Sequence, residues 1–193
     1  LRRDVFLPDH PGLMKSRLLT ADDVVFSYNF VDKSPKKILS YFDHIDRVVA
    51  RDKHTVVFEF NQFHAEWAYR YGYGYHSAIN PRELNQVDPK NWRNVAGSGP
   101  FGLEKYVQSN AQIYKKNPIY WGSDHVGGKS YKLPFVDRVI YRIIKDEATF
   151  LTALRTGQLD ILEAIRWIAV DHLKETTPEL QWNRWLGTGG TFV

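Results

Sequence analysis

The chain has 193 residues, of which 43% are hydrophobic and 25% charged, and its 26 Lys and Arg against 22 Asp and Glu give a net charge of +4. This composition excludes a wholly disordered chain, because enough apolar surface is available to offset the entropy of ordering. No apolar run approaches the ~20 residues that a membrane-spanning helix needs, which excludes a span of that kind. Because the cations are scattered among acids, a mixed solvated surface is favoured over a nucleic-acid-binding face.

Cysteine is absent from the chain. This excludes disulfide scaffolds, thiolate nucleophiles and Cys-type zinc sites, and it leaves the redox compartment open. The first residue is Leu1, and no basic-then-apolar leader precedes the predicted fold. We therefore expect any targeting signal to have been removed or to lie outside this chain.

The first half of the chain predicts a helix and a hairpin. Thr20 and Asp23 have the spacing of a capping box, and apolar residues at helical spacing follow, which predicts a helix over residues 21–32. Two strands with a polar turn predict a β-hairpin over residues 48–60. A short helix is predicted over residues 64–71.

A polar stretch with two prolines, residues 80–96, predicts a boundary, after which the sequence becomes rich in strands. Further helices are expected from Asp146 to a left-handed C-cap at Gly157, and near residues 168–175. Phe135, Tyr141 and Phe150 are expected to face the core. The predicted strands are 101–107, 111–116, 136–144, 159–162 and 180–186.

None of the short motifs carries a reaction. The segment GSGPFG at 97–102 matches a dinucleotide-binding fingerprint by its letters, but a polar loop precedes it and a strand pattern follows, which favours a tight turn. The seven His residues lie far apart without an i, i+4 pair, so no metal site is predicted. Glu163 follows the predicted strand 159–162 and is expected to point into a cleft, yet no second carboxylate at a defined spacing supports acid–base catalysis.

The order of several segments resembles one family, the large solute-binding proteins of oligopeptide and dipeptide ABC importers. The segments are LTADDVVFSY at 19–28, VAGSGPF at 95–101, KNPIYWG at 116–122, PFVDRV at 134–139 and LRTGQLDI at 154–161. The polar hairpin turn at 51–54 also falls in its family place.

The resemblance implies an α/β fold, namely one partial lobe of the periplasmic-binding-protein type, with mixed sheets, flanking helices and a two-lobe parent. Residues 1–95 would form the smaller subdomain of lobe I, and residues 96–186 part of its main sheet. Residues 187–193 would begin the crossover to a lobe II that is missing here, because family members are much longer.

The resemblance also implies a function without bond-breaking chemistry. Such a protein, exported to the periplasm or cell surface, captures peptides or related small solutes and delivers them to ABC transporter permease subunits. It would contact the membrane only through the transporter or a lipid anchor outside this chain, and it would need no cofactor, metal or nucleic acid. By their positions along the family pattern, the expected ligand-binding residues are Tyr41, Glu163, Gly187 and Thr188.

Two other classes of function stay open on the sequence alone. The aromatic residues and a pI of 9.2 would suit a nucleic-acid or polyanion-binding module. A glycan hydrolase that uses Glu163 is the third possibility. A loss of binding with rising salt concentration would indicate the nucleic-acid or polyanion-binding module. Turnover that disappears in Glu163→Gln would indicate the glycan hydrolase.

Overall fold

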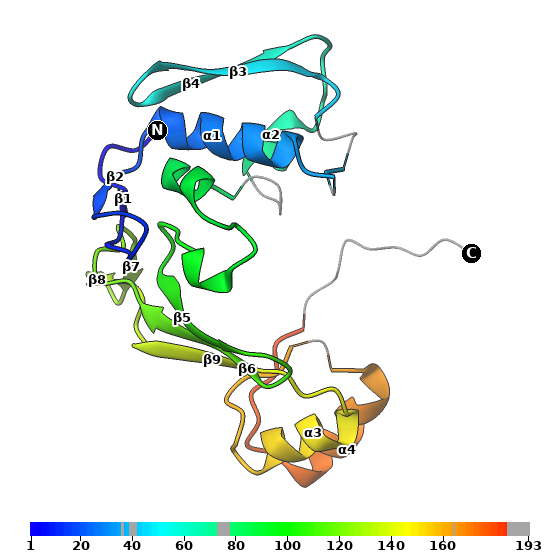
Figure 1. Cartoon of the computed structure of the whole chain (residues 1–193). Coiled ribbons are helices and arrows are strands. Elements are labelled where there is room, and N and C mark those ends of the chain that lie inside the picture. Colours follow the sequence, from blue (N-terminus) through cyan, green and yellow to red (C-terminus); the bar gives the residue numbers. More distant parts are fainter. Residues whose placement is uncertain (36, 39–41, 73–77, 164, 185–193) are drawn as a thin grey trace. The chain divides into compact units, whose positions relative to one another are not determined.

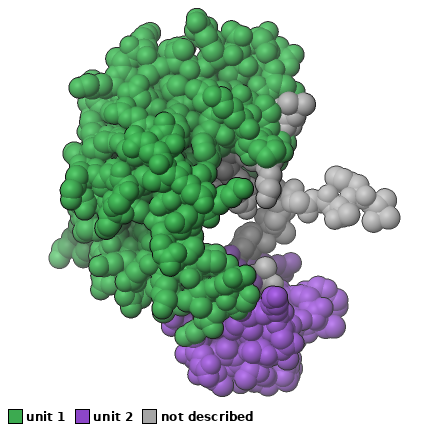
Figure 2. Space-filling model, in the orientation of Figure 1, with its two compact units in different colours: residues 1–142 green, residues 143–193 purple. Residues whose placement is uncertain are grey.

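The computed structural model describes residues 1–35, 37–38, 42–72, 78–163 and 165–184. The chain divides into two compact units, residues 1–142 and residues 143–193, each considered by itself (Figure 2). The predicted boundary between residues 95 and 96 falls inside the first unit and stays a prediction.

In the first unit, the described strands form small antiparallel sheets, with the orders β1-β2, β3-β4, β5-β6-β9 and β7-β8 (Figure 1). Its elements, in chain order, are β1 (Phe6–Leu7), β2 (Arg17–Leu18), α1 (Ala21–Asp32), β3 (Ile45–Asp52), β4 (Thr55–Phe60), α2 (Trp67–Gly72), the 3₁₀ helices η3 (Arg82–Gln86) and η4 (Trp92–Asn94), β5 (Phe101–Val107), β6 (Ala111–Lys116), β7 (Ser123–Val126), β8 (Lys129–Lys132) and β9 (Arg138–Arg142).

Helix α1 has the predicted bounds because its first turn is capped as the sequence indicates. The backbone N–H of Thr20 donates to Asp23 Oδ2 at 2.9 Å, and the two residues form a capping box. The helix ends at Asp32, shortly before Pro35. It packs against hairpin β3-β4, which lies alongside it in Figure 1.

Hairpin β3-β4 confirms the predicted pairing and begins earlier than predicted, at Ile45. Ile45 and Val48 are buried, so β3 contributes to the core. At the start of the ladder, Arg47 Nε donates to Glu59 Oε2 of the opposite strand at 2.6 Å. This polar cross-strand pair extends the hairpin beyond the apolar alternation from which it was predicted.

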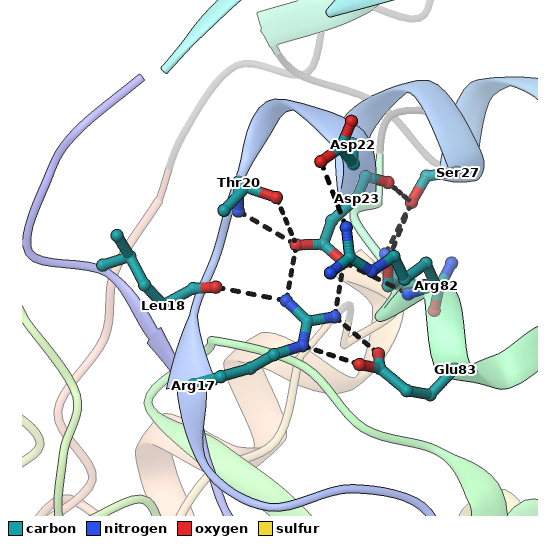
Figure 3. A network of polar contacts seen from close by, with 9 residues as sticks. Arg17, Leu18, Thr20, Asp22, Asp23, Ser27, Arg82 and Glu83 are labelled. Carbon is teal, nitrogen blue, oxygen red and sulfur yellow. Dashed lines mark hydrogen bonds and ion pairs between the residues drawn. The ribbon is translucent and has the colours of Figure 1, made fainter. Parts of the chain in front are cut away.

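The entry to α1 is fixed by a group that we call the Arg17 clamp: Arg17, Asp23 and Glu83 (Figure 3). The Asp23 side chain is fully buried, and Arg17 holds it with two bonds, Nη1 to Oδ2 at 2.8 Å and Nη2 to Oδ1 at 2.6 Å. The same guanidinium donates from Nε to Glu83 Oε1 at 2.7 Å. One side chain therefore joins β2, α1 and η3.

The clamp shifts the titration of both carboxyl groups. Burial alone would raise the pKa of Asp23, but hydrogen bonds from Arg17 and from the backbone N–H groups of Thr20 and Arg82 outweigh it and hold this pKa below its usual range. Hydrogen bonds from Arg17 likewise lower the pKa of Glu83. Both groups are thus held as carboxylates.

The sheet β5-β6-β9 confirms two of the predicted strands closely and a third in shortened form. Strands β5 and β6 form the predicted hairpin, with Ser109 in the turn at a φ of 57°. Strand β9 pairs antiparallel with β6 over residues 138–142, within the predicted 136–144.

Asn117 ties the two ends of hairpin β5-β6 together. Its side-chain Nδ2 donates to the carbonyl of Gly99 at 2.9 Å, and its backbone N–H donates to the carbonyl of Pro100 at 2.8 Å. Its Oδ1 accepts from the backbone N–H of Ile119 at 3.2 Å. The residue is buried, so these bonds are shielded from water.

The second unit contains α3 (Glu147–Arg155) and α4 (Trp167–Thr176), and both predicted helices are confirmed. Asp146 caps α3 by accepting the backbone N–H of Thr149 at 2.8 Å. Gly157 lies just past the helix with a φ of 69°, in the left-handed region that favours glycine.

Four expectations prove wrong. Residues 159–162 form no strand, and the described part of the predicted strand 180–186, residues 180–184, forms none either. A strand needs a partner edge, and no described segment pairs with them. Phe135 and Tyr141 are 59% and 61% exposed rather than core-facing, and each ring meets the ring of one tyrosine, Tyr131 and Tyr114 respectively.

The described residues contain no helix that is long and apolar enough to cross a membrane.

Replacing Asp23 by Asn tests the Arg17 clamp. The variant keeps the side-chain shape but removes the buried charge that faces Arg17, and we expect the free energy of unfolding to fall by about 3 kcal/mol. Urea denaturation measures this loss. The matched control is Asp22→Asn, whose exposed carboxylate contacts Arg82 at 3.1 Å and should change stability by about 0.5 kcal/mol or less. Equal losses in both variants would contradict the clamp.

The lowered pKa values of Asp23 and Glu83 also predict a pH dependence. Unfolding returns each carboxyl to an ordinary pKa of about 4, so the unfolded state binds more protons than the folded state as the pH falls. The stabilisation is complete above that value and is lost as the pH falls towards the folded-state pKa values. Urea titrations from pH 6 to pH 3 should show this loss, and the slope should be shallower in Asp23→Asn.

Gly157→Ala tests the end of α3. An added Cβ would meet no atom within 4 Å, so the cost comes from the positive φ alone and should be about 1 kcal/mol. Asn tolerates this conformation better than Ala, so Gly157→Asn should cost less. Thermal unfolding of the two variants compares them, and an equal cost would argue against the left-handed cap.

Candidate functional site

Glu163 lies in the segment between α3 and α4 and is exposed. Gly157 turns the chain out of α3, and the apolar residues that follow join no sheet among the described residues. Within the described part of the chain, its carboxylate has no hydrogen bond or ion pair. Glu163 is therefore a solvent-facing acceptor that can take a cation or an N–H donor without losing an internal partner.

The same segment exposes large apolar side chains. Ile161 is 79% exposed, and Trp167, the first residue of α4, is 83% exposed. Nearby in sequence, Arg166 Nε donates to Glu147 Oε1 at 2.8 Å, and hydrogen bonding to Glu147 raises the pKa of Arg166. This ion pair links the start of α4 to the first turn of α3. The segment between α3 and α4 therefore presents apolar side chains to solvent.

The other three predicted ligand-binding residues, Tyr41, Gly187 and Thr188, lie outside the described residues. The structure therefore places Glu163 and does not test whether the four residues come together. Their shared site stays a prediction.

A cavity of about 550 Å³ lies in the first unit, between α1, β4 and α2. The described residues that line it are mainly apolar or aromatic and include no Asp or Glu. None of the predicted ligand-binding residues that the structure describes is among them. The lining includes Val24, Tyr28, Phe42, Val56, Phe58 and Tyr71.

Two tyrosines, Tyr28 and Tyr71, are among the residues that line this cavity. Burial raises the pKa of Tyr28, and it raises the pKa of Tyr71 to about 12, so both hydroxyls stay protonated donors. The Tyr71 hydroxyl lies 2.9 Å from Nε2 of the fully buried His44. Sequence reasoning missed this cavity, because its walls come from segments whose apolar residues signal only a core.

His44 also stacks on His64, with 4.3 Å between the ring centroids. The described residues contain no group of three or more His, Asp or Glu side chains placed to hold a metal ion. The His44 ring also packs against the rings of Phe60 and Tyr71, so the two histidines belong to an aromatic cluster.

Comparison with known proteins gives one family. The sequence profile of the bacterial extracellular solute-binding proteins, family 5 (middle region), matches residues 17–191. A probable D,D-dipeptide-binding periplasmic protein of Escherichia coli is 28% identical over 174 residues, covering 88% of this chain and 32% of that protein. The peptide transport periplasmic protein SapA of Salmonella typhimurium is 26% identical over 191 residues, covering 90% and 33%. The chain thus spans about a third of these relatives' length.

Solved structures agree. The periplasmic binding protein DppA of Helicobacter pylori, in complex with the peptide STSA, superposes with a TM-score of 0.74 at 25% identity, over 91% of this chain and 36% of that one. OppA of Burkholderia pseudomallei shares the fold, with a TM-score of 0.71 at 16% identity. These likenesses confirm the predicted α/β fold of a partial periplasmic-binding-protein lobe. The relatives named here are binding proteins rather than enzymes. The chain belongs to the bacterial extracellular solute-binding proteins of family 5.

Proposed function

We propose that this chain is part of the first lobe of an exported protein that captures peptides and delivers them to the permease of an ABC importer. The observation that carries the proposal is the family match over residues 17–191, joined to the fold shared with a protein solved around a bound peptide. The ligand would lie against this lobe and be enclosed by a second lobe outside residues 1–193.

The lobe would consist of a smaller subdomain, residues 1–95, and part of a main sheet, residues 96–186, with the crossover starting at 187. The sheet order supports this division, since β3-β4 and β5-β6-β9 are separate sheets on either side of residue 95. The ligand-facing residues would be Tyr41, Glu163, Gly187 and Thr188.

Glu163 would recognise the peptide through charge. A carboxylate can accept a peptide N–H or an ammonium group, and such a charge-assisted bond strengthens when water is excluded. In the described residues Glu163 is exposed and unpartnered, so it is free to make that bond. The opposing wall would supply the exclusion of water, and most of the affinity would depend on closure.

Calorimetry on the full-length protein with a library of tri- and tetrapeptides tests the function. We expect Glu163→Gln to weaken the best peptide by about 10- to 100-fold, corresponding to about 1.5–3 kcal/mol for a hydrogen bond to a charged group. The matched control is Glu179→Gln, another exposed glutamate of the second unit, which should bind like the unaltered protein. Equal binding by both variants would remove Glu163 from the site. Absence of peptide binding by the unaltered protein would contradict the function itself.

Residues 1–193 alone should bind the same peptide much more weakly than the full-length protein. Losing the opposing wall removes contacts and the exclusion of water, so a weakening of about 100-fold or more is expected. Calorimetry of the two proteins side by side measures the difference. Equal affinities would show that one lobe suffices.

A further inference from the structure

The cavity between α1, β4 and α2 is not used by the proposed function. Its volume is about 550 Å³, and the one predicted ligand-binding residue that the structure describes, Glu163, is not among the residues that line it. Protein interiors are close-packed, and voids larger than a water molecule are few. Small-molecule sites occupy about 300–1,000 Å³, so this cavity has the size of a binding site.

Aromatic rings from three elements form much of the cavity wall. Tyr28 of α1 meets Phe58 of β4 edge to face, with 6.0 Å between the ring centroids and 88° between the planes. Phe58 stacks on Tyr71 of α2, with 4.9 Å between the centroids and 28° between the planes. Phe42 extends the row at the other end, 5.4 Å from Tyr28. The wall therefore presents both faces and edges of rings, which are the surfaces that a further aromatic ring contacts best.

The wall offers little to water or to a charged ligand. Two of its polar side chains are already paired, since Ser27 Oγ donates to the carbonyl of Asp23 at 2.7 Å and Arg70 donates to Glu66 Oε2 at 2.7 Å. The described lining contains no Asp or Glu that could face a cation. Water needs two to four polar partners to be held, and apolar cavities of about 150 Å³ stay dry yet bind apolar molecules.

We propose that this cavity binds a small, uncharged aromatic molecule, at a site separate from the one that takes the peptide. The guest ring would pack against Tyr28 and Phe58, with Val24 and Val56 beside it. Its affinity would come from apolar surface removed from water and from ring contacts, without any contribution from charge. The inference goes beyond the proposed function, because it does not depend on what Glu163 contacts.

Methyl NMR spectra of the full-length protein, titrated with indole, test the site. Indole is aromatic, uncharged and smaller than the cavity. The methyl signals of Val24 and Val56 should shift and saturate, with a Kd of about 1 mM or lower. Unchanged signals at these two residues, or shifts that grow without saturating, would overturn the proposal.

Filling the cavity should remove the binding. Val56→Phe adds a ring from β4, and Ala78→Phe adds one from an exposed position of the lining that the fold should tolerate. Each variant should bind indole about tenfold or more weakly, read from the methyl signals of Val24. The matched control is Val57→Phe, because Val57 is the next residue along β4 and is not in the lining, as expected where side chains alternate.

The control variant should bind indole like the unaltered protein. If Val56→Phe fails to fold, Ala78→Phe decides. Unchanged binding in Ala78→Phe, or an equal loss in Val57→Phe, would contradict the assignment of the site.

Tryptamine and 3-propylindole test the chemical class of the ligand. They differ at the end of the side chain, where one has an ammonium group and the other a methyl group. The ammonium group would lose its hydration without meeting a carboxylate in the described lining, so tryptamine should bind about tenfold or more weakly. Equal affinities would show that the site does not select uncharged molecules.

A competition experiment separates this site from the peptide site. The best peptide from calorimetry, at a saturating concentration, should leave the indole-shifted signals of Val24 and Val56 in place. Displacement of indole by the peptide would place the probe in the peptide site and overturn the inference. If the full-length protein binds no peptide, the indole titration can still be read, so the two proposals fail separately.

Discussion

The geometry of the first unit depends on a single guanidinium. Arg17 uses its forked donors on two carboxylates from different elements, one buried at the start of α1 and one on η3. A lysine could offer the charge but not the paired, planar bonds. Since Asp23 also caps α1, the helix cannot begin elsewhere without stranding a buried charge. The position of α1 in turn sets that of the hairpin packed along it.

Local chemistry explains which elements the sequence could predict. Thr20 and Asp23, Asp146, and Gly157 act within a few residues of their own position, and each lies where its pattern indicates. The link between Arg17 and Glu83 spans 66 residues, and no local pattern reveals it. Residues 159–162 have the composition of a strand and form none, because pairing is decided by a neighbouring edge and not by composition.

In the candidate site, too, a local pattern predicts one residue but not its long-range contacts. The position of Glu163 after an apolar segment points to this residue, and its side chain is exposed in the structure. No sequence pattern within this chain specifies which groups of the full-length protein would contact the Glu163 carboxylate. Under the proposed function, part of the binding surface would come from a second lobe outside this chain.

Asn117 has a consequence for a chain that contains no cysteine. By bonding both Gly99 and Pro100, it closes residues 99–117 into a ring without a covalent bond. A disulfide at the same place would restrain the unfolded chain as well, by shrinking the conformations open to it. The Asn117 closure exists only once the hairpin has formed, so it leaves the unfolded chain unrestrained. The hairpin is thereby held together in the native state, while the unfolded chain keeps its full conformational freedom.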